Sequence, residues 1–250
     1  MSFWFFLPPE DLARQGEIVL QGQVIAHFKA ARLRPGEQLV LADGRGRAFA
    51  ARLLALSSRS ATAQILHELQ NNAEPPLKVT LFTGLAKGEK MDQIVRQSVE
   101  LGVHKIVPVL TERTVIRLKG DKGEARAHRW QNVARSAAAQ CRRSAIPLIS
   151  KPLSFTEMLG LLHAEKLVLV PYEEEKDRGL GQLAANLAAP PRTAAVFTGP
   201  EGGISPREME KLKGLPGFYP FTLGPRILRA ETAPLAVLAV LMYLWGDWGP

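Results

Sequence analysis

From Leu77 onward, short apolar strand patterns alternate with longer amphipathic helix patterns, and this alternation constrains the fold more than any other feature of the chain. Strands joined by helices in this way usually form one sheet whose faces the helices cover. We therefore predict an α/β domain with a mainly parallel sheet. The expected strands are 78–82, 105–110, 166–170 and 194–198, and the expected helices are 91–101, 125–141, 180–187 and one that starts at 233.

The first 70 residues carry a different, β-type pattern. Alternating segments at 17–20, 37–41 and 48–53 are separated by turn residues, among which Asp43-Gly44 is typical of a β-hairpin. Breaking residues without periodicity follow from Asn71 to Pro76 and favour a boundary there. We predict a small β-rich domain over residues 1–72 and the α/β domain over residues 77–250.

Neither apolar run of the chain is typical of a membrane or export segment. The N-terminal run lacks a basic segment and stops at Pro8-Pro9, so we interpret it as an edge strand rather than a signal peptide. The run from Ala233 to Trp245 is shorter than the roughly 20 residues of a membrane helix. The single cysteine, Cys141, excludes an internal disulfide and a cysteine-based zinc cage. We expect a cytoplasmic protein with no membrane partner and no metal.

The formal charge of +8 is concentrated in one region. Eleven Lys and Arg residues stand against three acidic residues between Lys105 and Lys151. One interpretation is a solvated surface, and the other is a face that binds the phosphates of a nucleic acid. Charge alone does not distinguish RNA from DNA.

The segment from Ala194 to Glu208 is the richest local signal for a ligand site. A buried strand leads into Gly199-Pro200-Glu201-Gly202-Gly203, and Ser205, Pro206 and Glu208 then fit the N-cap, first and third positions of a helix. Glycines let backbone N–H groups approach a ligand at the carboxyl end of a strand. A simple tight turn is the alternative interpretation.

The same loop argues against nucleotide phosphates as the ligand. Glu201 would repel an anion where phosphate-binding loops supply a lysine, and neither G-x-x-x-x-G-K-[ST] nor G-x-G-x-x-G follows any expected strand. Kinases, NTPases and dinucleotide-dependent dehydrogenases are therefore disfavoured.

A second charged segment precedes the last helix. Thr232 is predicted to cap that helix, with Pro234 in its first turn. Arg226, Arg229 and Glu231 crowd just before the cap. They fit either a structural ion pair between Arg229 and Glu231 or a site where an arginine holds an anionic group.

These two segments, Phe197–Gly203 and Leu223–Ala233, together resemble the signature of the RsmE-type ribosomal RNA uridine N3-methyltransferases, which belong to the SPOUT (trefoil-knot) superfamily. The resemblance spans nearly the whole chain. Phe5-Phe6 and the Asp43-Gly44 hairpin are similar to the PUA-like β-barrel of that family. Further similar segments occur in the family's order at Glu100–Val103, Thr111–Arg113, Gln140–Arg143 and Ile146-Pro147.

The resemblance implies a deep trefoil knot that binds S-adenosylmethionine in a bent shape, in a site completed across a homodimer. It implies RNA contacts by Arg32, Arg113, Arg142 and Arg143. Ala233–Trp245, apolar on every face, is expected near the two-fold interface. The cofactor residues implied are Thr198, Gly199, Pro200, Glu201, Gly202, Gly203, Leu223, Gly224, Ile227, Leu228, Thr232 and Ala233.

The implied reaction assigns roles to two charged residues. Uridine N3 loses a proton when it is methylated, and the resulting anion spreads onto O2 and O4. Arg229 is our candidate for stabilising that charge, and Glu231 either accepts the proton or orients Arg229. N3 lies on the Watson–Crick edge, so we expect an unpaired uridine of small-subunit (16S) ribosomal RNA, held within a ribosomal particle.

Two other functions stay open from the sequence. One is a different knotted methyltransferase, acting on tRNA or on a ribose 2′-hydroxyl group. The other is a non-catalytic RNA-binding or assembly factor with the same fold. Binding of S-adenosylmethionine separates the enzymes from the assembly factor, which does not need it.

Overall fold

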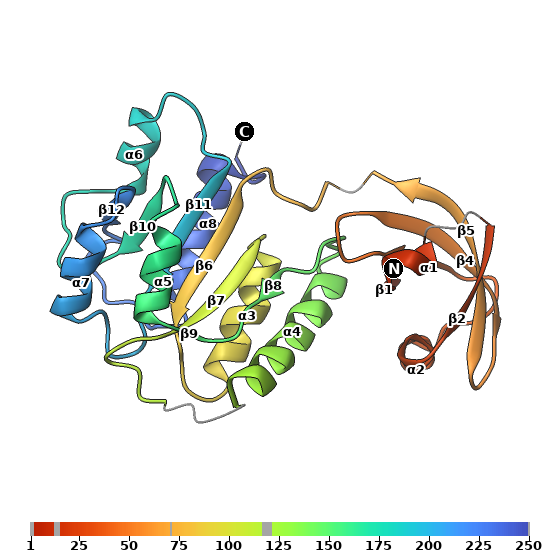
Figure 1. Cartoon of the computed structure of the whole chain (residues 1–250). Helices are drawn as coiled ribbons and strands as arrows, with labels where there is room; N and C mark the ends of the chain where they lie inside the picture. Colours follow the sequence, from red (N-terminus) through yellow and green to blue (C-terminus); the bar gives the residue numbers. More distant parts are fainter. Residues whose placement is uncertain (1–2, 13–15, 71, 117–121, 250) are drawn as a thin grey trace. The chain divides into compact units, whose positions relative to one another are not determined.

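The computed structural model of the chain describes residues 3–12, 16–70, 72–116 and 122–249 (Figure 1). The chain divides into two compact units. The first unit comprises Met1–Glu74 and Arg135–Ile146, and the second comprises Pro75–Ala134 and Pro147–Pro250. Each unit is described by itself below.

The first unit contains a five-stranded sheet in the order β1-β3-β4-β5-β2. β1 lies at one edge and pairs in parallel with β3, which confirms the predicted edge strand, and the other pairs are antiparallel. Apolar side chains of the sheet pack around the fully buried Phe28. The elements are β1 (Phe3–Phe6), α1 (Pro9–Leu12), β2 (Gly16–Gln21), α2 (Gln23–Ala30), β3 (Gln38–Ala42), β4 (Ala48–Leu56) and β5 (Ser60–Leu69).

The predicted turn at Asp43-Gly44 joins β3 to β4. One Asp43 carboxylate oxygen accepts hydrogen bonds from the backbone N–H groups of Arg45 and Arg47, at 2.7 and 3.1 Å. Gly44 adopts a φ of 72°, which favours glycine. The helix α2 and the strand β5 were not among the predicted elements. Their apolar residues become informative only against the folded sheet, where Val24, Ile25 and Phe28 lie on one helical face.

The second unit is built on a wholly parallel sheet in the order β12-β10-β11-β6-β7-β8, with β9 also paired to β7. This confirms the predicted α/β class with a mainly parallel sheet. The strands are β6 (Lys78–Gly84), β7 (Lys105–Leu110), β8 (Leu148–Ile149), β9 (Leu153–Ser154), β10 (Val168–Pro171), β11 (Thr193–Thr198) and β12 (Phe218–Phe221).

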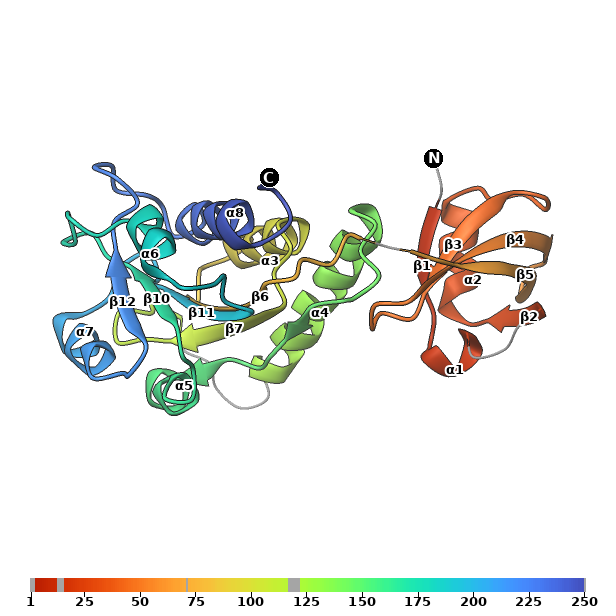
Figure 2. The ribbon, with the colours of Figure 1, turned by 90° about the horizontal axis from the view of Figure 1, so that it is seen from above.

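Helices cover both faces of this sheet. Figure 2 shows α3 and α8 on one face and α5 and α7 on the other. The helix α4 begins in the second unit and ends in the first. The helices are α3 (Lys90–Glu100), α4 (Lys122–Gln140), α5 (Phe155–Leu162), α6 (Leu180–Asn186), α7 (Pro206–Lys213) and α8 (Ala233–Trp245).

The two predicted helix caps have different outcomes. At α7 the Ser205 hydroxyl accepts from the Glu208 N–H (3.2 Å) and the Glu208 carboxylate accepts from the Ser205 N–H (3.1 Å), which confirms the capping box. At α8, Thr232 holds the N-cap position but its side chain makes no capping bond, so that part of the prediction is wrong. Thr232 already has helical backbone angles, φ −88° and ψ −40°, rather than the extended ones of a capping residue.

Packing within the chain buries part of the apolar surface of helix α8. Val237, Leu238, Leu241 and Met242 are buried, and the helix packs on α3, β6 and β11. The opposite side stays open, because Tyr243 is 59% exposed. Among the described residues, no helix is long and apolar enough to cross a membrane.

Candidate functional site

A cavity of about 730 Å³ opens in the second unit where β10, β11 and β12 end. Parallel sheets bind ligands at the carboxyl ends of their strands, and the volume lies within the range of small-molecule pockets. Three loops form its walls: residues 171–176 after β10, residues 198–204 after β11 and residues 222–230 after β12. Lys90 at the start of α3 and Ala233 at the start of α8 complete the lining.

The cavity brings together the two segments that the sequence singled out. Thr232 is the only residue of the expected cofactor set that does not line it. Of the expected catalytic pair, Arg229 lines the cavity, whereas Glu231 contacts the lining residue Lys90. The expected cofactor residues that line it are Thr198, Gly199, Pro200, Glu201, Gly202, Gly203, Leu223, Gly224, Ile227, Leu228 and Ala233.

The glycine loop after β11 is too tightly packed for side chains. A Cβ atom on Gly199 would lie 3.0 Å from the side chain of Ile204, and one on Gly202 would lie 3.0 Å from the Cβ of Arg113. Gly203 adopts a φ of 72°. The backbone of this loop therefore forms the cavity wall directly. Two of its polar groups are bonded within the chain, since the Gly203 N–H donates to the Pro200 carbonyl at 2.9 Å and the Gly202 carbonyl accepts from Arg113.

Two carboxylates from the two segments share one ammonium group. Lys90 Nζ lies 3.5 Å from Glu201 Oε1 and 3.3 Å from Glu231 Oε2. Burial raises the pKa of Glu201, but hydrogen bonds from backbone N–H groups, including that of Lys87, and the charge of Lys90 outweigh it, so the pKa is lowered overall. Glu231 Oε2 is buried without a hydrogen-bond partner, because its contact with Lys90 is an ion pair without hydrogen-bond geometry.

Arg229 lines this cavity and is exposed. The structural ion pair between Arg229 and Glu231 that the sequence left open is not formed, since Glu231 pairs with Lys90 instead. Within the described part of the chain, no carboxylate pairs with Arg229. Its guanidinium group is thus available for an anionic ligand.

Sequence reasoning missed one wall of the cavity. Tyr172, Glu173, Glu175 and Lys176 follow β10 and line the site, as does Lys90. Burial, together with the neighbouring carboxylates of Glu174 and Glu173, raises the pKa of the Tyr172 hydroxyl to about 12, so the ring stays neutral. The available signal was their position directly after the predicted strand 166–170, at the same edge of the sheet as the glycine loop.

The four arginines expected to contact RNA lie in different surroundings. Arg32 and Arg142 are exposed. Arg113 is exposed and donates from Nη1 to the Gly202 carbonyl at 2.9 Å. Arg117 and Lys119, which contribute to the basic stretch, lie outside the described residues.

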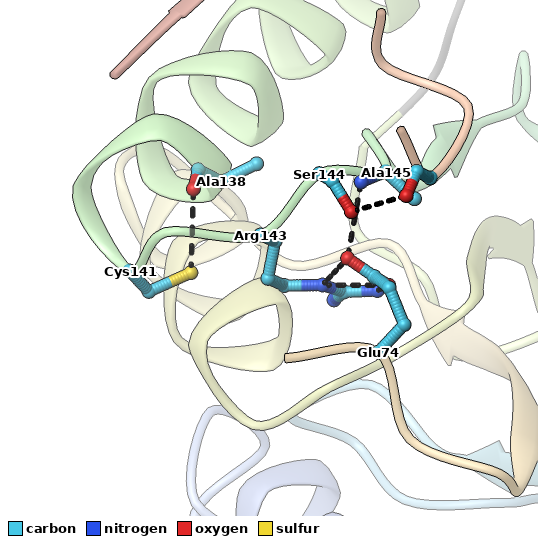
Figure 3. A network of polar contacts seen from close by, with 7 residues as sticks. Glu74, Ala138, Cys141, Arg143, Ser144 and Ala145 are labelled. Atoms are coloured by element: carbon cyan, nitrogen blue, oxygen red, sulfur yellow. Dashed lines mark hydrogen bonds and ion pairs between the residues drawn. The ribbon is translucent and has the colours of Figure 1, made fainter. Parts of the chain in front are cut away.

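The burial of Arg143 contradicts the predicted contact with an RNA phosphate. It is only 4% exposed, and its Nη2 donates to Glu74 Oε2 at 2.8 Å (Figure 3). The other Glu74 oxygen accepts from the Ala145 N–H at 3.0 Å, and the neighbouring Ser144 hydroxyl donates to the Gly46 carbonyl at 2.8 Å. Arg143 therefore contributes to the packing of the first unit. A guanidinium group enclosed by its own carboxylate partner is not presented to a phosphate.

The fold and the cavity agree with the families that the chain matches. Residues 73–242 match the family described as RNA methyltransferase domain, and residues 20–66 match the family described as RNA methyltransferase PUA domain. The class of this protein is thus a two-part RNA methyltransferase with a PUA-like N-terminal region.

Comparisons with individual proteins narrow the class. The chain is 30% identical to the ribosomal RNA small subunit methyltransferase E of Bacillus subtilis, covering 96% of this chain and 95% of that protein. It is 34% identical to the protein of the same name from Synechocystis, covering 96% and 77%. The crystal structure of the Neisseria gonorrhoeae methyltransferase E bound to S-adenosylmethionine matches with a TM-score of 0.89, 36% identity and coverage of 99% and 100%. The chain belongs to the ribosomal RNA small subunit methyltransferase E family.

Proposed function

We propose that this chain transfers the methyl group of S-adenosylmethionine to N3 of a uridine in small-subunit (16S) ribosomal RNA. The observation that carries the proposal is that both signature segments line one cavity, where Arg229 is exposed and has no carboxylate partner among the described residues. The similarity to a methyltransferase E bound to S-adenosylmethionine supports the same donor here.

The cavity suits this donor by its chemistry. When bound, S-adenosylmethionine supplies a methyl group on a positively charged sulfur. The glycine loop 199–203 presents backbone without side chains, so a nucleoside can approach it closely, and Leu223 and Leu228 offer apolar walls. The buried Oε2 atom of Glu231 lacks a hydrogen-bond donor among the described residues, and a bound ligand can provide one.

We also propose the finer architecture that the family resemblance implies. Residues 1–72 would act as a PUA-like RNA-binding domain and residues 77–250 as a knotted methyltransferase domain. The wholly parallel sheet with its ligand cavity between the loops after β11 and β12 is compatible with a trefoil knot at these loops. Residues 135–146 pack with the first unit despite lying within the second range.

Arg229 is our candidate for stabilising the transition state. A uridine whose N3 approaches the donor develops negative charge on O2 and O4 as the N3 proton leaves. A guanidinium group with a fixed fork of N–H donors stabilises such a charge, and one well-placed donor lowers the activation barrier by about 3–4 kcal/mol. Among the described residues, no carboxylate forms an ion pair with Arg229 that would compete for those donors.

Glu231 is our candidate for handling the proton. Its Oε2 atom is buried, lacks a hydrogen-bond partner and faces the Lys90 ammonium at 3.3 Å. An ionised carboxylate with a free lone pair can accept the N3 proton directly or through a water molecule.

The N3 position requires an unpaired or extruded uridine, because N3 lies on the Watson–Crick edge. We propose that Arg32, Arg113 and Arg142 contact the flanking RNA backbone in a ribosomal particle. All three are exposed, as phosphate contacts require. Arg143 is left out because it is buried against Glu74.

We further propose a homodimer with the open side of α8 at its two-fold interface. Val240 and Tyr243 on this helix are 37% and 59% exposed, and the cavity residue Ile227 is 87% exposed. Large exposed apolar side chains are typical of a surface that a partner covers. Sedimentation at micromolar concentration would give twice the mass of the chain, and a monomeric mass would contradict this arrangement.

A mass map of modified nucleotides tests the reaction itself. Small-subunit ribosomal RNA from cells without this protein should lack one N3-methyluridine that is present in the parent cells, and the purified enzyme should restore it. A missing methyl group on a ribose 2′-hydroxyl or in tRNA would instead favour another methyltransferase. An unchanged map, together with a defect in ribosome assembly, would favour a non-catalytic factor.

A further inference from the structure

The short segment Thr111–Arg113, which follows β7, is bonded to the glycine loop and to the start of α7. The Glu112 N–H donates to Glu208 Oε1 at 2.8 Å, and the Ser205 hydroxyl donates to Glu112 Oε2 at 2.7 Å. Arg113 Nη1 donates to the Gly202 carbonyl at 2.9 Å. These bonds join residues about 90 positions apart in the sequence, so the segment acts as a brace on the loop that lines the cavity.

Arg113 is the part of this brace that touches the cavity wall. A Cβ added to Gly202 would lie 3.0 Å from Arg113 Cβ and 3.3 Å from the Arg113 carbonyl oxygen, so the two backbones are in close contact. The hydrogen bond to the Gly202 carbonyl adds a directional restraint. The loop backbone is therefore held both by the backbone of Arg113 and by its guanidinium group.

Most of the Arg113 guanidinium group is still open to a second ligand. A guanidinium carries five N–H donors, and within the described part of the chain Gly202 is its only hydrogen-bond partner. The residue is exposed, and its charge acts on Tyr172, which lines the cavity. Arg113 is not itself a lining residue, but it lies against the glycine loop that lines the cavity, so an RNA whose base enters the cavity can bring a phosphate within its reach.

We propose that Arg113 is a positioning residue that couples the binding of the methyl donor to the binding of RNA. One guanidinium group holds the glycine loop through Gly202 and an RNA phosphate through its remaining donors. The phosphate fixes the side chain in the rotamer that also restrains the loop. This inference rests on the proposed function, because it requires both ligands at one cavity.

Coupling of this kind is reciprocal, which makes it measurable from either side. If the donor raises the affinity for RNA by some factor, RNA must raise the affinity for the donor by the same factor. Couplings between two sites are typically about 5–150-fold. A residue that only braced the loop, or only contacted RNA, would change one affinity and leave this factor unaltered.

The test measures RNA affinity with and without S-adenosylhomocysteine, the demethylated donor, so that no transfer occurs. The RNA is small-subunit ribosomal RNA transcribed in vitro and therefore unmodified. The variants are Arg113→Met, which keeps an unbranched apolar stem but has no guanidinium group, and Arg113→Lys, which keeps the charge but not the planar fork. Arg207→Ala is the matched control, an exposed arginine on α7 without a hydrogen bond or ion pair among the described residues.

We expect S-adenosylhomocysteine to raise RNA affinity at least fivefold in the native chain and in Arg207→Ala. In Arg113→Met both separate affinities should fall and the factor should approach one. Arg113→Lys should recover part of the RNA affinity without the coupling, and it replaces Arg113→Met if the latter does not fold.

Three results would overturn the inference: a native factor of one, a loss of donor affinity alone, or a loss of RNA affinity alone. A native chain that binds neither ligand would instead contradict the proposed function.

Discussion

The segments 140–146 and 222–232 are both rich in arginine, but the arginines that matter most in them, Arg143 and Arg229, lie in opposite surroundings. In the first, Arg143 is enclosed with Glu74 and the surrounding polar groups are hydrogen-bonded to one another (Figure 3). In the second, Arg226 and Arg229 are exposed, and the nearby Glu231 oxygen lacks a hydrogen-bond partner. The first segment thus encloses Arg143 with a carboxylate partner, whereas the second leaves Arg226 and Arg229 open to a ligand.

The difference shows what a count of basic residues measures. Burying a charge is costly unless a partner and hydrogen bonds compensate for it, so a buried arginine is committed to its partner. An exposed arginine without a partner contributes little to folding and can bind a ligand at little cost to the fold. The eleven basic residues between Lys105 and Lys151 include both kinds, so only some of them can serve a phosphate.

The largest expected effect is on the enclosed pair. Arg143→Ala should lower the free energy of unfolding by about 3 kcal/mol, because it leaves the Glu74 carboxylate without its cation. Urea unfolding followed by circular dichroism measures this change. Arg47→Ala, which breaks the exposed pair with Glu68 in the same unit, should leave stability nearly unchanged. Equal effects of the two changes would remove the distinction between enclosed and open charges.

A change in the exposed segment 222–232 should instead lower the rate of methyl transfer. Arg229→Lys keeps the charge but loses the planar fork, so single-turnover methyl transfer should fall about 100-fold, with donor affinity and melting temperature little changed. Near-native turnover in this variant would end the assignment of Arg229 to the reaction. A lowered melting temperature would place Arg229 with Arg143 as a structural residue.

A smaller effect is expected at the glycine loop. Gly202→Val should weaken S-adenosylmethionine binding at least tenfold, because the new Cβ would lie 3.0 Å from Arg113 Cβ and displace the loop. Calorimetry of the folded variant measures this affinity. Gly160→Val on α5 serves as the control, since a Cβ there meets no atom within 4 Å. Unchanged affinity in a folded Gly202→Val protein would remove the loop from the site.

The smallest effect distinguishes two neighbouring arginines. Arg142→Ala should reduce the slope of log affinity for RNA against log salt concentration by about 0.7–0.9, the value for one lost phosphate contact. Arg142 is exposed, whereas Arg143 is buried. Affinity for RNA measured across a salt series gives the slope. An identical slope in the variant would mean that Arg142 does not touch the RNA backbone.

The parts of the fold that depend on neighbouring residues could be predicted from the sequence. The parallel sheet, the hairpin at Asp43-Gly44 and the capping box of α7 each follow from a short pattern. The segments that line the cavity were recognised for the same reason, since a strand that ends in glycines and a capped helix is a local signal.

Contacts between distant residues could not be predicted in this way. Nothing near Arg143 in the sequence indicates that Glu74 encloses it, and nothing near Glu231 points to Lys90 rather than Arg229. The prediction of a capping bond from Thr232 was wrong for the same reason. The Arg229 carbonyl accepts from the N–H groups of Thr232 and Ala233, and this turn already holds the Thr232 backbone in a helical conformation. Such outcomes depend on the packed structure.

The path of α4 limits how this chain can be rearranged by recombination. The chain passes between the units after Glu74, after Ala134 and after Ile146, so the first unit is encoded by two separate stretches. An exchange of the N-terminal stretch alone between two relatives would leave Arg143 facing a foreign residue in place of Glu74. Functional hybrids of this family should therefore inherit both stretches from the same parent.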